Sequence, residues 1–369
     1  MIYLDHAATT PMHPDALEQY RDTAERAYGN SSSLHDTGED ALQLLEQARN
    51  KLMQWLGVTE GTIIFTGSGS EANYIALRHL LRQTNKTTVL TLKSEHDSVL
   101  LPLQRWAVHW QALDLKTTGE FDWDLFEQAC TEEVGVVSIQ QVNSETGFIF
   151  PVAAIAAFCR KKDILFHCDG IQGFLKDPVD LTDVEAYTVS SHKVYGPKGL
   201  GAVYLRHPLF SPYYEAHHEF GIRPGTVDVP GIAAFMMACH RYLQENQQIQ
   251  ASSKRFRGML KKRLPAAYYQ IIESPQQLHS ICAIHTKQRD GQFVLLALNR
   301  AGIAVSAGSA CRAGENGPNS TLRAIGFDES AAHGLIRLSF GRMTTAEEVE
   351  RCLDVLCSLE ESDQLERQE

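Results

Sequence analysis

Short apolar runs rich in β-branched residues alternate with segments of helical periodicity between Thr62 and Arg206. The runs that predict strands are TIIFT (Thr62–Thr66), TTVLTL (Thr87–Leu92), GVVSIQQV (Gly135–Val142), ILFHC (Ile164–Cys168), YTVS (Tyr187–Ser190) and GAVYL (Gly201–Leu205). Helical patterns such as that of Val152–Lys161 fall between them. Strand–helix alternation of this kind predicts an α/β fold with a mostly parallel sheet that helices cover on both faces.

The pattern differs on either side of this region. Before it, apolar residues at spacings of four and three predict an amphipathic helix over roughly 38–56. After about residue 250 we expect helices and strands at Ser253–Leu264, Ile281–Thr286, Phe293–Ala301, Gly302–Ala310, Leu335–Phe340 and Ala346–Leu359. The chain therefore predicts a large domain of residues 15–250 and a smaller α+β domain of residues 1–14 with 251–369.

Composition narrows the class of protein. Of 369 residues, 43% are hydrophobic and 21% are charged, as in soluble globular proteins, and the net charge of −11 argues against a surface that coats nucleic acid. No run approaches the roughly 20 apolar residues that cross a bilayer, and MIYLDHAATTP is too short and too polar for a secretory signal. We expect a cytoplasmic protein that binds neither nucleic acid nor membrane.

The eight cysteines form no Cys-x-x-Cys pair and do not cluster with histidine at zinc spacing, so we expect no intrinsic metal site. In a reducing compartment most should be buried thiols; Cys159 and Cys239 lie in apolar helical sequence, and Cys168 is interpreted as packing. Cys311 differs, because it begins a polar loop with glycines. The adjacent Arg312 favours the thiolate that sulfur chemistry requires.

Lys193 follows a predicted buried strand in SSHKVYGPKG (Ser190–Gly199) and precedes a Gly/Pro turn. Lysine is rarely found at such a position without a partner, and a cofactor aldehyde that condenses with its amine would provide one. Taken alone, Lys193 is more readily interpreted as a surface lysine on a loop.

Two other segments change that interpretation. Asp169 ends the strand ILFHC, where ligand sites of open α/β sheets lie, although a lone aspartate there more often caps a helix. The segment FTGSGSEAN (Phe65–Asn73) runs through glycines into a helix that starts near Ser70, which points backbone N–H groups at an anion. It lacks the features of a Walker loop or a dinucleotide fingerprint, and alone it fits a plain strand–helix turn equally well.

Together, the three segments meet the needs of pyridoxal 5'-phosphate (PLP). Lys193 would bind the aldehyde, the turn before Ser70 would bind the phosphate, and Asp169 would keep the ring nitrogen protonated so that the ring can act as an electron sink. Gln172 could hydrogen-bond the ring hydroxyl.

Further motifs follow in order along nearly the whole chain: LDHAATTP, GSGSEAN, SEHDSVL, VNSETG, HCDGIQ, SSHKVYGPKG, RPGT, SAGSAC and IRLSFG. Together they closely resemble the cysteine desulfurases of the NifS/IscS kind, within the class V aminotransferase group of PLP enzymes. SHK-x-YGPKG and SAGSAC are the most specific of these motifs. The resemblance implies the fold-type-I PLP-dependent transferase architecture, with a catalytic cysteine loop on the smaller domain.

The resemblance also implies the roles of individual residues. Lys193 corresponds to the Schiff-base lysine, and His96 to a histidine that stacks on the PLP ring and moves protons. Thr226 corresponds to a threonine that reaches the PLP phosphate of the neighbouring subunit, which implies a homodimer. The positions that correspond to phosphate-binding residues are Gly69, Ser70, Ser190 and His192.

On the substrate side, Arg337 corresponds to the arginine that holds the α-carboxylate, for which a planar two-pronged donor is suited. Asn143 and Ser144 are expected beside it. Most relatives read Asn-Asn-Glu where this chain reads Asn143-Ser144-Glu145, so a hydroxyl of shorter reach replaces an amide that contacts cofactor and substrate.

Cys311 corresponds to the cysteine that accepts sulfur, on a loop that resembles the long loop of the NifS/IscS branch. The resemblance implies that Lys193 removes the α-proton of L-cysteine, with help from His96, and that Cys311 becomes a persulfide as L-alanine leaves. An iron–sulfur scaffold or a sulfur carrier would accept the sulfur for clusters, thiolated tRNA or thio-cofactors, and Cys311 would transiently ligate a cluster on a scaffold.

Two other functions stay open at this point. A selenocysteine lyase or another class V aminotransferase would have the same fold, although an aminotransferase does not need SAGSAC. A non-catalytic binding or regulatory homologue is the second alternative. The presence of every expected catalytic residue argues against it.

Overall fold

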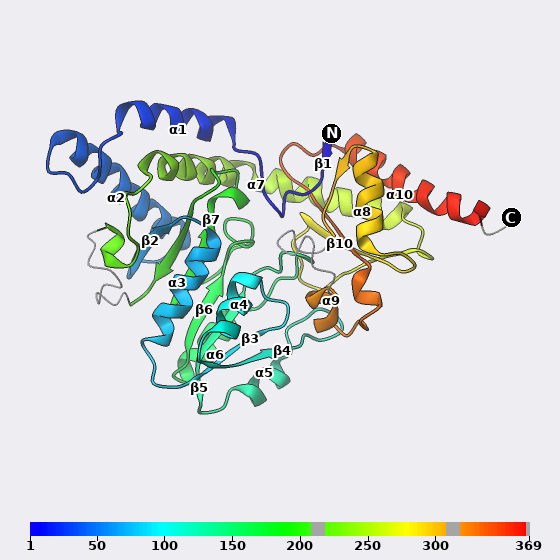
Figure 1. Ribbon diagram of the computed structural model, residues 1–369, viewed down its shortest axis with the longest axis horizontal. Helices are drawn as coiled ribbons and strands as arrows, with labels where there is room; N and C mark the ends of the chain where they lie inside the picture. The colour runs from blue at the N-terminus through cyan, green and yellow to red at the C-terminus, as the bar shows by residue number, and fades with distance from the viewer. Residues whose placement is uncertain (208–217, 308–317, 367–369) are drawn as a thin grey trace.

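The structure is a computed structural model that describes residues 1–207, 218–307 and 318–366. A seven-stranded sheet forms the centre of its larger part (Figure 1). The strands lie in the order β2-β8-β7-β6-β5-β3-β4, and only β8 runs against the others. Their bounds are Thr62–Thr66 (β2), Thr88–Leu92 (β3), His109–Leu113 (β4), Val134–Gln140 (β5), Leu165–Asp169 (β6), Ala186–Ser190 (β7) and Gly201–Leu205 (β8). The predicted mostly parallel α/β sheet is confirmed.

Strand β4 was not predicted from the sequence. Its sequence, HWQAL, begins with a histidine and holds a central glutamine, and only Leu113 is buried. The strand lies at the edge of the sheet, and no strand that the structure describes pairs with its outer side. An edge strand needs less apolar surface than a central one, so its signal in the sequence is weak.

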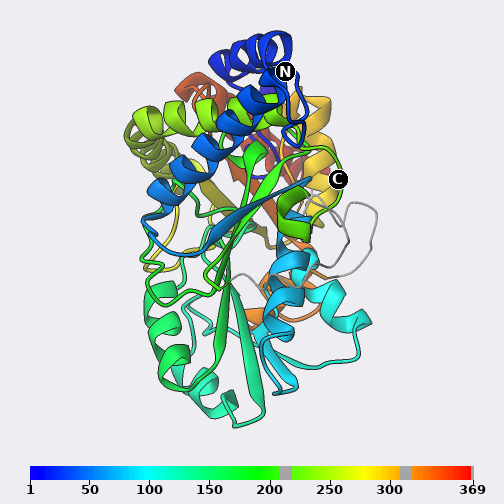
Figure 2. The ribbon, with the colours of Figure 1, turned by 90° about the vertical axis from the view of Figure 1, so that its left-hand side faces the viewer.

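Helices cover both faces of the sheet, as expected for strand–helix alternation. Alternate side chains of a strand enter different cores: Ile63 and Phe65 of β2 pack on one side and Ile64 on the other. The first core includes side chains of α2, α5, α6 and α7, and the second includes side chains of α3 and α4, so that the sheet lies between them (Figure 2). These helices are α2 (Asp36–Leu56), α3 (Gly69–Leu81), α4 (Asp97–Arg105), α5 (Trp123–Ala129), α6 (Val152–Lys161) and α7 (Val229–Arg263).

A smaller part of the molecule has its own sheets and core. An antiparallel sheet of order β12-β10-β9 and a parallel pair of β1 with β11 share a core with Leu4, Phe256 and Leu260. The strands are β1 (Ile2–Tyr3), β9 (Tyr269–Ile271), β10 (Ile281–Thr286), β11 (Ile303–Ala304) and β12 (Leu335–Ser339). The remaining helices are α1 (Pro14–Arg26), α8 (Gly291–Arg300), α9 (Ser320–Ala324) and α10 (Ala346–Glu366), with 3-10 turns η1 (Ser191–Lys193), η2 (His218–Gly221) and η4 (Ala331–His333).

Helix α7 starts well before the helix that the sequence predicted from Ser253. It has 35 residues and runs unbroken past residue 250. Ile232 and Phe235 near its start pack under the large sheet, whereas Phe256 and Leu260 near its end enter the smaller core. One rigid element therefore contacts both cores, and the division into two domains near residue 250 stays a prediction.

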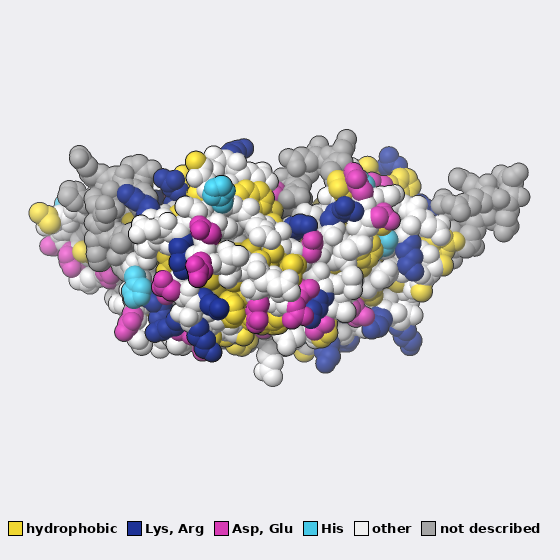
Figure 3. Space-filling view, turned by 90° about the horizontal axis from the view of Figure 1, so that it is seen from below, with side chains coloured by type: hydrophobic (Ala, Val, Ile, Leu, Met, Phe, Trp, Pro, Cys, Tyr) yellow, Lys and Arg dark blue, Asp and Glu magenta, His cyan; other side chains and the backbone are white. Residues whose placement is uncertain are grey.

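Charged side chains of both signs are interspersed over the face of the molecule shown in Figure 3. Among the helices that the structure describes, none combines the length and the apolar character that a membrane crossing requires.

Candidate active site

A cavity of about 160 Å³ lies at the carboxyl ends of β5, β6 and β7, where the loop after β2 meets the smaller part of the molecule. Open α/β sheets bind ligands at this edge. Most residues that the sequence singled out line it together: Gly69, Ser70, His96, Ser144, Asp169, Gln172, Ser190, His192, Lys193 and Arg337.

Lys193 occupies η1, the 3-10 turn directly after the buried strand β7. Its Nζ donates to the backbone carbonyl of Ala8 at 2.9 Å and to that of Ala7. The turn after it is tight, because a Cβ at Gly196 would lie 2.0 Å from the Ser191 Oγ. The Gly/Pro sequence that follows Lys193 thus lets the chain form a tight turn directly after the lysine. The amine of Lys193 remains at the cavity.

Asp169 is the last residue of β6, and its carboxylate is held from two sides. Oδ2 accepts a hydrogen bond from Asn73 Nδ2 at 2.8 Å, and Oδ1 accepts one from the backbone N–H of Ile171 at 2.9 Å. Asn73 in turn accepts from the Thr188 hydroxyl at 2.6 Å. The sequence did not single out Asn73. The sequence did offer a signal for Asn73 as a site residue. Asn73 follows Gly69 by four residues in α3, so both residues lie on the same face of the helix.

The other end of the cavity suits an anion. Helix α3 begins at Gly69, with Ser68 as its N-cap, so its free backbone N–H groups lie at the cavity wall. A Cβ at Gly69 would lie 2.5 Å from the Ile171 Cδ1, so a larger residue would require the Ile171 side chain to shift. The hydroxyl of Ser190 is buried and has no hydrogen-bond partner among the described residues. A bound phosphate would supply the missing acceptor.

Two histidines line the cavity in defined states. Burial, and then the charges of Lys193 and other lysines, lower the pKa of His192 to about 3, so its imidazole is neutral. His96 caps α4: its Nδ1 accepts the backbone N–H of Ser98 at 3.1 Å. A neutral His96 ring must therefore carry its proton on Nε2.

Arg337 lies in β12 and is only 2% exposed. Its Nη2 is 2.7 Å from the Asp5 Oδ1, and its Nη1 donates to the backbone carbonyl of Ser144 at 3.0 Å. Asp5 also accepts the Ser306 hydroxyl at 2.9 Å. Sequence reasoning missed Asp5 as a site residue, and the only signal for it was the LDHAATTP motif.

Of the predicted site residues that the structure describes, Asn143 and Thr226 do not line the cavity. Asn143 is buried and uses its side chain inside its own turn, where Oδ1 accepts the N–H groups of Glu145 and Thr146 at 3.0 and 2.8 Å. Thr226 is exposed and away from the cavity. Cys311 lies outside the described residues.

The cysteines that the structure describes are buried or half-buried, and none lines the cavity. Cys159 and Cys239 are buried in a core, as predicted, and so is Cys168. Burial raises the pKa of the Cys130 thiol to about 11, which keeps it protonated near neutral pH. The described thiols are thus unsuited to attack a ligand here.

The geometry fits PLP. Lys193 offers an amine, Asp169 a fixed carboxylate, and the α3 terminus with Ser190 a place for a phosphate. These three features belong to separate segments, and each matches one part of the cofactor.

Comparisons with known proteins agree with this geometry. Residues 2–352 match the Aminotransferase class-V family. A putative cysteine desulfurase NifS of Bacillus subtilis (strain 168) is 38% identical over 367 residues, which cover 96% of this chain and 93% of that protein. The cysteine desulfurase NifS of Azotobacter vinelandii is 33% identical over 368 residues, with coverages of 95% and 90%.

Solved structures show the same fold. A NifS-like protein superposes with a TM-score of 0.88 at 28% sequence identity and covers 97% of this chain and 99% of its own. The structure of SspA in complex with cysteine superposes with a TM-score of 0.79 at 28% identity, with coverages of 92% and 99%.

Proposed function

The chain belongs to the class V aminotransferase family, and we propose that the cavity at Lys193 is the active site of a PLP-dependent cysteine desulfurase. One observation carries this proposal: residues from separate segments converge on one cavity, and each suits one part of PLP or of an amino-acid substrate. The relatives named cysteine desulfurase cover nearly the whole chain, which supports the reaction type.

Different residues of this chain contact different parts of the cofactor in this proposal. Lys193 would bind its aldehyde, Asp169 would hold a proton at its ring nitrogen, and Gln172 would donate to its ring hydroxyl. His96 would contact the ring, and the phosphate would be bound by Gly69, Ser70, Ser190 and His192. When bound, PLP supplies an electrophilic carbon for the substrate amine and a ring that takes up the electron pair at the α-carbon.

Arg337 binds the substrate carboxylate. Its guanidinium is oriented beforehand by Asp5 and by the carbonyl of Ser144, so little conformational entropy is lost on binding. Ser144 stands at the same wall with a hydroxyl in place of the usual amide. The amine of Lys193 accepts the α-proton, and His96 holds a proton at Nε2.

Cys311 completes the reaction. Its thiolate attacks the sulfur of the substrate, a sulfur–sulfur bond forms and the carbon–sulfur bond breaks. The electron pair of the broken bond stays with the carbon, which takes up a proton, so the substrate leaves as L-alanine and Cys311 keeps the sulfur as a persulfide. An iron–sulfur scaffold or a sulfur-carrier protein then takes this sulfur. Thr226 is exposed in one chain. It serves the phosphate site of a second copy, so the protein acts as a homodimer. We also propose that it acts in the cytoplasm.

A Cys311→Ser variant tests this function. It should bind PLP with unchanged visible absorption, because the cofactor residues are intact, yet lose sulfide release by at least about 100-fold because the nucleophile is gone. Cys130→Ser is the matched control, since burial keeps that thiol protonated, and it should retain activity. Normal sulfide release by Cys311→Ser would contradict the assignment.

The alternatives predict different products. An aminotransferase would convert cysteine to a keto acid without releasing alanine, and a selenocysteine lyase would turn over selenocysteine but hardly cysteine. A non-catalytic homologue would take up no PLP. The names of the relatives favour none of the three.

A further inference from the structure

A second, smaller cavity lies behind the candidate active site. Ala7, Gln172 and Lys193 line both cavities and so form part of the wall between them. On the far side of this wall lies Lys176, which follows Gln172 in the loop between β6 and β7. Within the described part of the chain, Lys176 forms no ion pair with a carboxylate. Lys176 is partly buried. Removing an ammonium group even partly from water without an acidic partner costs stability, which calls for a functional reason.

The first contact of Lys176 concerns the orientation of an amide. Its Nζ donates to the Gln172 Oε1 at 3.1 Å, while the Gln172 Nε2 donates to the carbonyl of Ala7 at 2.8 Å. An ammonium group can only donate hydrogen bonds. The Gln172 side chain must therefore turn its oxygen, and not its amide nitrogen, toward Lys176. With its oxygen held by Lys176, Gln172 has a second N–H left for the larger cavity, where it is a donor and not an acceptor.

The second effect of Lys176 concerns charge. Burial, and then the positive charge of Lys193, lower the pKa of Lys176 to about 7. The repulsion is reciprocal, so a charged Lys176 disfavours a proton on the nitrogen of Lys193. The ionisable groups around the two cavities are His6, His96, Asp169, His192 and Arg337, with the tyrosines Tyr195 and Tyr242 beside Lys176.

Two of the three cavity histidines, His6 and His192, add no positive charge near Lys193. Burial is the main cause that lowers the pKa of His6 to about 4, and His192 is neutral for a similar reason. Asp169 is held by Asn73 at the far end of the cofactor site, and Arg337 is already paired with Asp5. Lys176 is therefore the cation placed directly behind Lys193.

We propose that Lys176 is a positioning residue for the proposed desulfurase reaction: it orients the Gln172 amide as a donor toward PLP and keeps the nitrogen of Lys193 free of a proton. This inference rests on the proposed function. A proton-free amine is the form of Lys193 that binds an aldehyde and accepts the substrate α-proton.

The test is a pH titration of the visible absorption of the PLP-loaded protein. Removal of the charge in Lys176→Met should raise the midpoint of this titration by about one pH unit. Lys176→Arg, which stays charged over the whole titration, should not raise the midpoint. Lys262→Met is the control: Lys262 is exposed near the end of α7 and lines neither cavity, so solvent screens its charge.

Lys176→Gln separates the effect on the Gln172 orientation from the effect of charge. It also provides a second neutral variant if the methionine variant does not fold. It keeps a side-chain N–H for Gln172 but carries no charge, so it should raise the midpoint as the methionine variant does and still retain PLP on dilution like the wild type. The methionine variant should lose PLP several-fold faster. If Lys176→Met and Lys176→Gln both keep the wild-type titration midpoint while the wild type is active, the inference about Lys176 is wrong and the proposed function stands. A wild type that takes up no PLP would overturn the proposed function as well.

Discussion

Arg337 shows how a single side chain prepares a binding site. It is almost fully buried, and two of its guanidinium nitrogens already have partners in Asp5 and Ser144. Its Nε has no hydrogen-bond partner among the described residues. A buried charge held in this way is oriented before the ligand arrives.

Arg337→Lys should raise the KM for cysteine about tenfold or more, equivalent to about 1.4 kcal/mol. A lysine keeps the charge but cannot contact Asp5, Ser144 and a carboxylate with one planar group. Steady-state kinetics measure the effect, and Arg300→Lys, on the exposed end of α8, is the control. A KM equal to that of the control would rule out this role for Arg337.

The roles of some site residues were predictable from the sequence, and those of others were not. Lys193, Asp169 and Gly69 follow strand ends, and strand ends can be read from a local run of apolar residues. Asp5 and Lys176 have no such local signal, because their partners lie elsewhere in the chain or act through charge. Only the folded structure shows that Asp5 is paired with Arg337.

Within residues 1–207, 218–307 and 318–366, the edge strand β2 is covered by side chains and not by another strand. Arg49 of α2 donates to the carbonyl of Ile63, and Glu219 of η2 accepts the N–H of Phe65 at 2.6 Å. The two side chains also form an ion pair at 2.5 Å. The carbonyl of Ile63 and the N–H of Phe65 are therefore not free to pair with another chain.

Glu219→Gln should lower the free energy of unfolding by about 3 kcal/mol, because it leaves the buried Arg49 guanidinium without its main counter-charge. Urea denaturation measures this loss. Asp114→Asn breaks the Lys93–Asp114 pair, which is about half exposed on both sides, and should cost less than about 0.5 kcal/mol. Equal losses in the two variants would show that the Glu219 pair contributes no more than a surface pair.

The helices show the same division between local and distant signals. Val152–Lys161 was predicted with its bounds as found for α6, since its apolar face repeats regularly. The first half of α7 was missed: it begins with Pro230 and Gly231, which are typical of turns, and it continues through a polar run. Packing of α7 against α1 and α2 overrides these weak local preferences.

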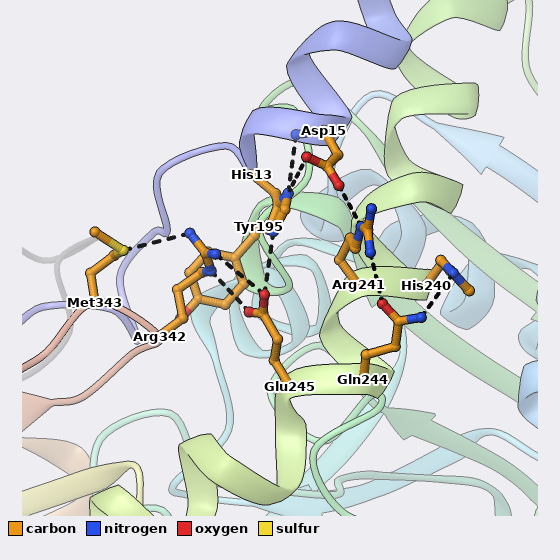
Figure 4. A network of polar contacts seen from close by, with 9 residues as sticks. All are labelled: His13, Asp15, Tyr195, His240, Arg241, Gln244, Glu245, Arg342 and Met343. Atoms are coloured by element: carbon orange, nitrogen blue, oxygen red, sulfur yellow. Dashed lines mark hydrogen bonds and ion pairs between the residues drawn. The ribbon is translucent and has the colours of Figure 1, made fainter.

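Across the whole molecule, a network of polar contacts ties α1 and α7 to the segment after β12 (Figure 4). Arg342 contacts Glu245 of α7 at 2.9 Å, and its backbone N–H donates to the hydroxyl of Tyr195 at 2.8 Å. His13, the N-cap of α1, lies 3.4 Å from the same Glu245. Tyr195 follows Lys193 by two residues, so this network connects the smaller part of the molecule to the lysine turn.

Glu245→Gln should lower the free energy of unfolding by about 1 kcal/mol at pH 7, a value reduced by its partial exposure. Burial alone would raise the pKa of Glu245, but the hydrogen bonds and charge of Arg342 lower it below its usual value of 4.5 overall. The carboxylate therefore stabilises the fold above about pH 4.5, and this contribution is lost as the pH falls through the lowered pKa.

Urea denaturation of Glu245→Gln and wild type at several pH values measures this dependence. The difference between the two proteins should be largest near neutral pH and should vanish in acid. A difference that persists at pH 3 would mean that Glu245 stabilises the fold by packing and not by its charge.

The contacts of the first residues have a consequence for synthesis of the chain. Asp5 and Arg337 are 332 positions apart, and β1 pairs with β11. At 5–20 residues per second, Asp5 leaves the ribosome on the order of half a minute before its partner exists. The large sheet can form during that time, but the site for the substrate carboxylate cannot, because Arg337 is not yet made. A nascent chain that is released before β12 is made therefore lacks the residue that binds the carboxylate of an amino acid.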